Sequence, residues 1–407
     1  MHIQCSNGSP MVNTIDHLPL LPLFVYYASH YFSPTITTWK QDELGMYHTL
    51  RLHGRIRHIE LALSPSNLHE VLALMDENFP ILEHLSLTSS FSPYGEYRLP
   101  PTLPKGFLAP NLRHLALFGI CLPKRLRLLT STVSLVTLTI SSIQTSSYFR
   151  PKLLVARLQS LPLLEELTIE FSILIPRPGT EGELLGEDGA PLTLPRLKTL
   201  RFCGASTYLE SLVAQMSVPL LENLTIRLFK IAFLLPHLSH LVNNTKAFKL
   251  SSAKVGFHHD EVYISTIHDN IDHGLELVPF TLCVSCEPLD RQIDCVAQIC
   301  HALTLTLSGV TELSLYYEGI PTELRNGTID SATWHKLLRS FIGVKELYIN
   351  DVLSEELSRA LQANEVESHP GFLPKLQSIH ARRNLFTSFI DTRQVMGRSV
   401  LFEWYQW

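Results

Sequence analysis

The sequence has 407 residues, a formal net charge of −5 and 17% charged residues. This balance argues against nucleic-acid binding, because phosphate recognition needs a cluster of lysine and arginine that the sequence lacks. Its seven cysteines are scattered, and it has neither a secretory signal nor an apolar stretch long enough to span a membrane, so we expect an intracellular protein of the cytoplasm or nucleus.

Residues 1–55 precede the regular part of the sequence. They contain prolines and aromatic residues around Phe24, Tyr26 and Tyr27. We predict that this N-terminal segment caps the edge of the region formed by residues 56–407, because a stack of repeats needs covered ends.

One short pattern recurs along residues 56–407: an apolar residue, two variable residues, a second apolar residue, one variable residue and a third apolar residue. Its clearest copies are LEHLSL, LRHLAL, LEELTI and LENLTI, each with a proline two residues before the first apolar position. We expect twelve strands, spaced by 23 to 34 residues, with first positions at Ile56, Leu82, Leu112, Leu135, Leu164, Leu197, Leu221, Thr245, Pro279, Val310, Val344 and Leu376. The copies at Thr245 and Pro279 keep only the last two apolar positions.

The pattern is that of the strand in a leucine-rich repeat. Helical spacing of apolar residues follows several strands, as in Leu209-Leu212-Val213-Met216 and Trp334-Leu337-Leu338-Phe341. Asn67 to Glu70 also reads as a capping box at a helix start. The sequence therefore predicts an α/β leucine-rich-repeat solenoid, or horseshoe, with parallel strands on the concave face and helices on the convex face.

Two segments interrupt this pattern. Residues 176–191 are rich in glycine, proline and acidic residues and are expected to form a mobile insertion, because they offer little apolar surface to bury. Residues 251–279 are expected to be irregular, since the repeat pattern fades there.

Short motifs resemble a large fungal family of F-box and leucine-rich-repeat-like proteins. They include His17-Leu18-Pro19 and the segments starting at Trp39, Arg55, Pro195 and Leu235. In that family the F-box docks to the adaptor of a cullin–RING ubiquitin ligase, and the repeats hold the substrate. The F-box itself is absent here, because Leu18-Pro19-Leu20-Leu21 lacks its acidic residue and Pro22 would break its first helix. An F-box could lie upstream, or the ligase link could be lost, and the adaptor is an expected partner only in the first case.

Two clusters of potential ligand residues are candidate metal sites. Cys283, Cys286, Cys295 and Cys300 resemble a four-cysteine zinc site, but the strand and helix pattern makes them diverge. Histidines and aspartates crowd residues 258–273, where the simpler interpretation is a solvated polar loop. No phosphate-binding loop or nucleophile motif is present. We therefore expect no cofactor, no metal and no enzymatic activity.

The expected function is non-catalytic protein recognition, as in the substrate-binding part of an F-box subunit. The alternatives are a structural or scaffolding repeat protein without a ubiquitin link and, less favoured, a metal-binding or enzymatic repeat protein. If the apolar positions face the core, the variable positions beside the second apolar residue face the concave surface, where an unknown target protein would bind. The candidate binding residues are His84, His114, Glu166, Arg201, Glu346 and Tyr348.

Overall fold

The computed structural model describes residues 2–4, 21–28, 45–89, 100–122, 127–143, 149–172, 192–229, 235–249, 251–268, 277–287, 289–318, 331–363 and 373–405. The chain divides into two compact units. Unit 1 contains Met1–Arg201 and Gln215–Leu220, and unit 2 contains Phe202–Ala214 and Leu221–Trp407. The insertion expected at residues 176–191 lies outside the described residues, and the boundary expected at residue 55 stays a prediction.

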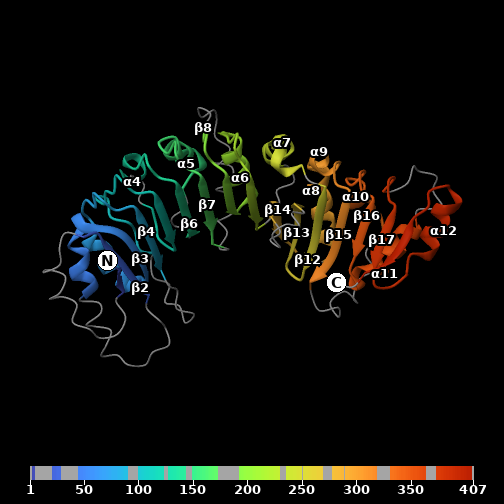
Figure 1. Ribbon diagram of the computed structural model, residues 1–407, viewed down its shortest axis with the longest axis horizontal. Coiled ribbons are helices and arrows are strands. Elements are labelled where there is room, and N and C mark those ends of the chain that lie inside the picture. Colours follow the sequence, from blue (N-terminus) through green and yellow to red (C-terminus); the bar gives the residue numbers. More distant parts are fainter. Residues whose placement is uncertain are drawn as a thin grey trace, which may run out of the picture. The chain divides into compact units, whose positions relative to one another are not determined.

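The strands of unit 1 follow one another in chain order and pair in parallel (Figure 1). They are β1 (His2–Gln4), β2 (Leu23–Ala28), β3 (Ile56–Leu63), β4 (His84–Ser89), β5 (His114–Phe118), β6 (Thr137–Ile143) and β7 (Glu166–Phe171). A separate two-stranded parallel sheet is formed by β8 (Leu192–Thr193) and β10 (Met216–Ser217). Because β2 pairs with β3, part of the N-terminal segment extends the sheet.

The helices of unit 1 connect these strands. They include η1 (His53–Arg55), α3 (Pro65–Leu74), α4 (Arg127–Ser131) and α5 (Pro151–Leu158), and residues 45–50 are helical as well. Leu68, Val71 and Leu72 on α3 are buried, as their spacing predicts. The cap differs from the expected one: the Ser64 side chain accepts the hydrogen bond from the Asn67 backbone N–H. A serine one turn earlier therefore begins the helix.

The strands of unit 2 have the order β9-β11-β14-β13-β12-β15-β16-β17-β18. Their bounds are β9 (Thr199–Gly204, whose first three residues belong to unit 1), β11 (Asn223–Leu228), β12 (Ser252–His258), β13 (Glu261–His268), β14 (Leu277–Ser285), β15 (Glu312–Glu318), β16 (Glu346–Ile349), β17 (Ser378–Ala381) and β18 (Leu401–Trp404). The pairings of β13 with β12 and β14 are antiparallel. The pairs β11–β14, β12–β15 and those from β15 to β18 are parallel, so the sheet is mostly parallel.

The helices of unit 2 are α6 (Ser206–Val213), α7 (Pro236–Asn244), η4 (Lys246–Phe248), α8 (Leu289–Ala302), α9 (Thr304–Leu307), α10 (Ser331–Leu338), α11 (Asp351–Ala363) and α12 (Thr387–Val395). Helix α10 packs between α8 and α11. Trp334, Leu337 and Leu338 are buried along α10, and Phe341 is buried just beyond its end. Among the described helices of the chain, none is long and apolar enough to span a lipid bilayer.

Most of the expected strands are confirmed. Eleven of the twelve predicted copies contain a strand of the structure. Their apolar positions form the core: Leu82, Leu85 and Leu87 are each 0% exposed. The α/β class and the parallel pairing of successive repeats follow from this burial, because each strand supplies one row of apolar side chains to the same side of the sheet.

The strand expected at Thr245 is wrong. The chain forms the short helix η4 there, and the next strand begins at Ser252. In the described part of the region expected to be irregular, residues 251–268 form an antiparallel hairpin, β12–β13, that departs from the repeat, and β14 begins at Leu277. Valine and isoleucine at alternate positions, such as Val262 and Ile264, bury one side of it. This period-two pattern is that of a strand, but its spacing differs from the repeat.

Gly343 gives a test of the packing between successive repeats of unit 2. An added Cβ would lie 2.7 Å from the carbonyl oxygen of Val310 and closer still to that of Ser308. Because both atoms are backbone, we expect Gly343→Ala to lower the free energy of unfolding by about 1–3 kcal/mol, measured by urea denaturation. Gly309→Ala is the matched control, since its nearest contact would be 3.9 Å away. Equal stability of the two variants would contradict the close approach.

Candidate functional site

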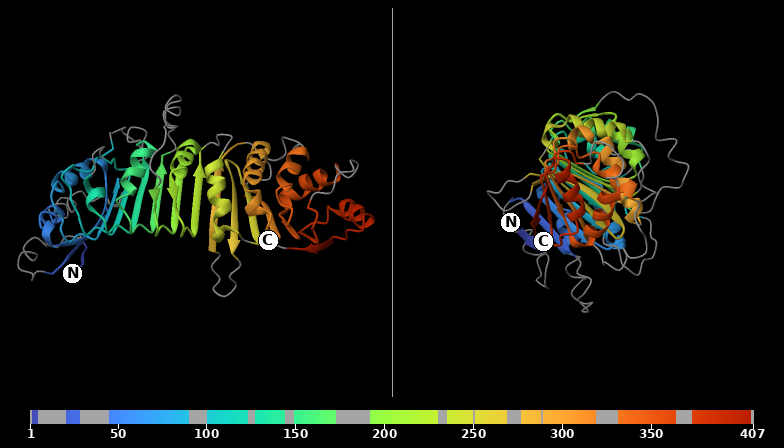
Figure 2. Two further views of the ribbon diagram at one scale, coloured as in Figure 1. Left: turned by 90° about the horizontal axis from the view of Figure 1, so that it is seen from above. Right: turned by 90° about the vertical axis from the view of Figure 1, so that its right-hand side faces the viewer.

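Each strand presents alternate side chains to opposite faces of its sheet. In β4, Leu85 and Leu87 are buried, whereas His84 and Ser86 are partly exposed. The helices cover the buried face, as the two further views in Figure 2 also show. We call the opposite face, formed by the positions that alternate with the core positions, the open face of each unit.

All six predicted binding residues lie at open-face positions. Unit 1 carries His84 on β4, His114 on β5, Glu166 on β7 and Arg201 on β9, and unit 2 carries Glu346 and Tyr348 on β16. Glu166 and Arg201 are exposed, and the other four are partly exposed. Their placement agrees with the expected geometry, whereas their role in binding stays a prediction.

Three histidines form a row across the open face of unit 1. The rings of His58 and His84 stack with centroids 4.0 Å apart and an interplanar angle of 4°, and the His84 and His114 centroids are 5.6 Å apart. Tyr26 extends the row beyond His58 at 4.7 Å, and Nδ1 of His114 lies 2.6 Å from the Thr137 hydroxyl at the other end. His58 is not among the predicted binding residues. It occupies the same repeat position as His84 and His114, and this was the signal that could have revealed it.

The position of His84 within this row affects its charge. Burial, together with the neighbouring His58 and His114, lowers the pKa of His84 to about 4, against a smaller opposing effect of Glu60. A histidine with this pKa is neutral at pH 7. The middle of the row therefore acts as an aromatic and hydrogen-bonding surface rather than as a cation.

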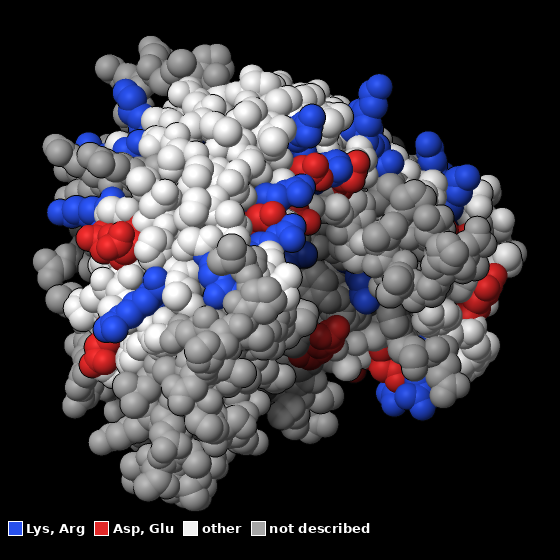
Figure 3. All heavy atoms as spheres, turned by 60° about the vertical axis from the view of Figure 1, so that its left-hand side comes forward, with Lys and Arg blue, Asp and Glu red and all other residues white. Residues whose placement is uncertain are grey.

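A groove of about 480 Å³ runs along the edge of unit 1 where the strands begin. It is lined by Ile81, Glu83, Asn111, Arg113, Ser134, Val136, Leu163, Glu165 and Arg196. Side chains of both signs lie close together here: Arg57 pairs with Glu83, and Lys198 with Glu165, each at 2.9 Å. Figure 3 shows such mixing of blue and red side chains on the face that it draws.

An aromatic group lies on the open face of unit 2 near its last strands. The Tyr348 ring stacks on His380, with centroids 4.2 Å apart and an interplanar angle of 10°. The Tyr405 ring meets Tyr348 edge-on at 5.2 Å. The Tyr348 hydroxyl donates a 2.8 Å hydrogen bond to Glu346. Burial raises the pKa of Tyr348, and the hydrogen bond to Glu346 and the charges of Glu346 and Glu312 raise it further.

A second aromatic group lies on β12, β13 and β15. Tyr263 and Tyr316 pack edge to face, with centroids 5.6 Å apart, and the Lys254 ammonium lies 4.5 Å from the centre of the Tyr316 ring. Gly256 makes this packing possible, because an added Cβ would lie 2.5 Å from the Tyr263 ring. Lys254 and Tyr316 thus form a cation–π contact on this sheet.

The four cysteines considered as a zinc site have different surroundings. Cys283 donates a 3.1 Å hydrogen bond to Glu261, and Cys300 is fully buried on α8. Cys286 and Cys295 interact with each other. Within the described part of the chain, no three of these sulfur atoms lie within 4.8 Å of one another. This arrangement agrees with the expectation that the four cysteine side chains point in different directions.

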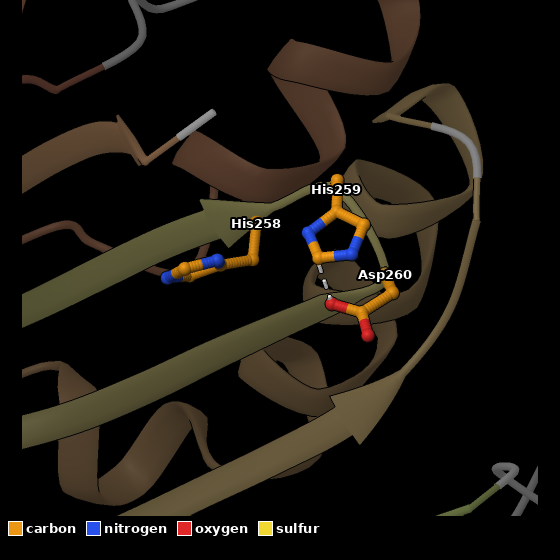
Figure 4. A group of neighbouring side chains, drawn as sticks. All are labelled: His258, His259 and Asp260. Carbon is orange, nitrogen blue, oxygen red and sulfur yellow. Dashed lines mark ion pairs between the residues drawn. The ribbon is translucent and has the colours of Figure 1, made fainter. Parts of the chain in front are cut away.

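His258, His259 and Asp260 are a possible metal-binding group at the β12–β13 turn, since their ligand atoms lie within 4.8 Å of one another. His259 and Asp260 face each other with a 3.4 Å ion pair, whereas the His258 ring points away from them (Figure 4). Nε2 of His258 lies 2.7 Å from Glu318 instead. His259 and Asp260 are exposed, so the group is not prearranged around one point. The remaining members of the predicted cluster lie outside the described side chains.

Protonation of His84 should destabilise unit 1. Because folding lowers the pKa of His84 from 6.5 to about 4, the unfolded chain binds this proton more readily, and stability falls as the pH falls through that range. His84→Phe keeps a ring in the row but removes the proton site. Between about pH 6.5 and pH 4, we expect the wild type to lose ~1 kcal/mol more unfolding free energy than this variant, allowing for solvent at a half-exposed site.

Urea denaturation at several pH values across this range measures the difference. His69→Gln, at an exposed position of α3, is the control and should keep the pH dependence of the wild type. Identical pH profiles for the wild type and His84→Phe would contradict the lowered pKa.

Comparison with known proteins gives limited help. No protein-family model and no curated protein matches the chain. Among solved structures, it is similar to the leucine-rich repeat-containing protein LegL7 from Legionella pneumophila, with 12% sequence identity over 98% of each chain and a TM-score of 0.28. At that TM-score the likeness carries no argument about this chain, so the repeat pattern and the strands themselves must support any functional conclusion.

Proposed function

We propose that the chain is a protein-recognition module of the leucine-rich-repeat type and that its open faces contact a partner protein. One observation carries the proposal. Large polar and aromatic side chains stand on a hydrogen-bonded sheet at positions that cannot belong to the core. Arg201 and Tyr348 are of the residue types enriched among energetically important interface contacts. A rigid sheet also presents them at little conformational cost.

The proposal includes a solenoid architecture in which each strand, loop and helix forms one repeat. The spacing of 23 to 34 residues and the parallel pairing of successive strands support it. Such units bury their apolar faces mainly against neighbouring units, so the open face is left available along the array.

The proposal includes no catalytic step. Cys283 is a buried free cysteine on the open face of unit 2. Burial, together with Glu261, which accepts its hydrogen bond and carries a negative charge, raises the pKa of this thiol to about 12. A thiol with this pKa stays protonated at neutral pH and is a poor nucleophile.

A role in substrate recognition for a ubiquitin ligase is a finer proposal, supported by the short motifs that resemble the fungal F-box and leucine-rich-repeat-like family. A scaffolding role without ubiquitin is the alternative. Affinity capture from the native cell separates the two. Co-capture of a ligase adaptor and cullin with the partner would favour the first, and a partner captured without them would favour the second.

Single substitutions on each open face test the general proposal. We expect Arg201→Ala or Tyr348→Ala to reduce capture of the partner at least about fivefold, because interface anchors often contribute more than 1 kcal/mol. Arg201→Ala should change the free energy of unfolding by less than ~0.5 kcal/mol. Tyr348→Ala should cost about 1 kcal/mol, because it loses ring contacts with His380 and Tyr405.

The control is Glu355→Ala on α11, whose side chain is 77% exposed on the helical side. Capture should be unchanged in this variant. If both open-face variants also capture the partner undiminished, the binding surface lies elsewhere and the proposal fails.

A further inference from the structure

The groove at the edge of unit 1 is built on residues that occupy one position in successive repeats. The members of this edge row are Arg57, Glu83, Arg113, Val136, Glu165 and Lys198. From Glu83 onward, each backbone N–H donates to the carbonyl oxygen of the member before it, over 2.7 to 2.9 Å. Because hydrogen bonds fix the backbone of the row, its side chains are spaced like those of adjacent strands, about 4.8 Å apart.

The acidic residues that line the groove are paired within the fold. Glu83 pairs with Arg57, and Glu165 pairs with Lys198, each at 2.9 Å. The hydrogen bond and the charge of Lys198 lower the pKa of the Glu165 carboxyl, so this group is ionised at neutral pH. Each carboxylate is thus matched by one cation, and any further cation in the groove gives it a net positive charge.

Two arginines supply this further charge. Arg113 belongs to the edge row, and Arg196 lines the groove two residues before Lys198. Both side chains are exposed, and within the described part of the chain neither forms an ion pair with a carboxylate. Arg196 has only a small effect on the pKa of Glu165, behind that of Lys198. Two guanidinium groups are therefore available to bind carboxylates from outside, each through two parallel hydrogen bonds.

Apolar side chains lie between the two arginines. Val136 follows Arg113 in the edge row, and Leu163 stands in the next repeat, before the one that carries Arg196. Val136 and Leu163 are partly exposed, and Ile81, at the other end of the groove, is 37% exposed. The middle of the groove thus offers apolar surface that an occupant would bury, with a positive charge on each side of it.

We propose that this groove binds an extended segment of a partner protein in which two acidic residues flank one apolar residue. The two carboxylates bind Arg113 and Arg196, and the apolar side chain lies between them on Val136 and Leu163. This inference goes beyond the proposed function, because the groove shares no residue with the six predicted binding residues.

The spacing of the repeats sets the spacing of the acidic residues. From β5, which follows Arg113, to β9, which follows Arg196, the sheet spans three strand separations, about 14 Å. Residues i and i+4 of an extended chain are also about 14 Å apart. Residue i+2 lies midway and points to the same side as these two. The expected order is therefore acidic, any residue, apolar, any residue, acidic.

The test uses the full chain and a labelled peptide of about nine residues, with aspartates two positions before and after a central leucine and serine or glycine elsewhere. Fluorescence anisotropy should show binding that weakens at least about threefold between roughly 50 mM and 300 mM salt, because exposed charges are screened. Asparagine in place of both aspartates should weaken binding at least about tenfold. Moving each aspartate one position toward the leucine should have the same effect, because the carboxylates then point to the opposite side. Equal binding of the three peptides, or measurable binding of none, would overturn the proposal.

Variants of the chain localise the site. Arg113→Gln with Arg196→Gln should bind the acidic peptide at least about tenfold more weakly, because both guanidinium groups are lost. The matched control is Arg51→Gln with Lys152→Gln, which removes the same charge from exposed positions outside the groove and should bind as the wild type does. Thermal unfolding should show nearly unchanged stability in both double variants, because all four positions are exposed. Equal peptide affinity of the two double variants would overturn the location.

This experiment fails separately from the proposed function. If Arg201→Ala and Tyr348→Ala reduce partner capture but the acidic peptide does not bind, only the present inference is overturned. If the peptide binds as expected but capture is insensitive to both open-face substitutions, the proposed function is overturned and the groove remains a binding site.

Discussion

The burial of alternate strand residues beneath the helices is the constraint on which the rest of the structure depends. Leu85 and Leu87 in β4, like Leu347 and Ile349 in β16, are completely buried. Because side chains alternate along a strand, burying one row forces the residues between onto the other face. The core therefore decides which residues can meet a partner, and the parallel register decides which of them become neighbours.

Because of this parallel register, residues at the same position of successive repeats lie next to one another on neighbouring strands. His58, His84 and His114 precede the second apolar residue of three successive repeats; the His58 and His84 rings stack, and the His114 ring meets His84 at a tilt. Tyr348 and His380 follow that residue in two later repeats and also stack. Residues far apart in sequence come together here because each strand begins at the same position of its repeat. A row of neighbouring side chains can therefore be predicted once the repeats of the sequence are aligned.

The sequence predicts the strands correctly where each strand coincides with a copy of the repeat pattern. It fails to predict them where a strand lies outside that pattern. Leucine spacing predicts β3 to β7 and β15 to β17, because each has all three apolar positions. The strand expected at Thr245 fails because the chain there forms η4, and β12 and β13 then pair as a hairpin that no repeat spacing describes. Strands β2 and β18 were missed because they lack the full pattern and gain stability from the neighbouring strand. For the candidate site, the alternation of apolar and variable residues along each strand predicts which residues face away from the core. Which of these charged side chains become neighbours depends on the pairing register of the strands, which follows only from the structure.

The two open faces present different chemistry on a common framework. In unit 1 the central imidazole of the histidine row is neutral at pH 7, and nearby acidic and basic side chains pair with each other, as Lys198 does with Glu165. In unit 2, the Glu346 carboxylate accepts a hydrogen bond from the Tyr348 hydroxyl, and the Tyr348 ring stacks on His380. The open face of unit 1 therefore combines imidazole rings with paired charges, whereas that of unit 2 combines carboxylate, phenol and imidazole groups in one aromatic cluster.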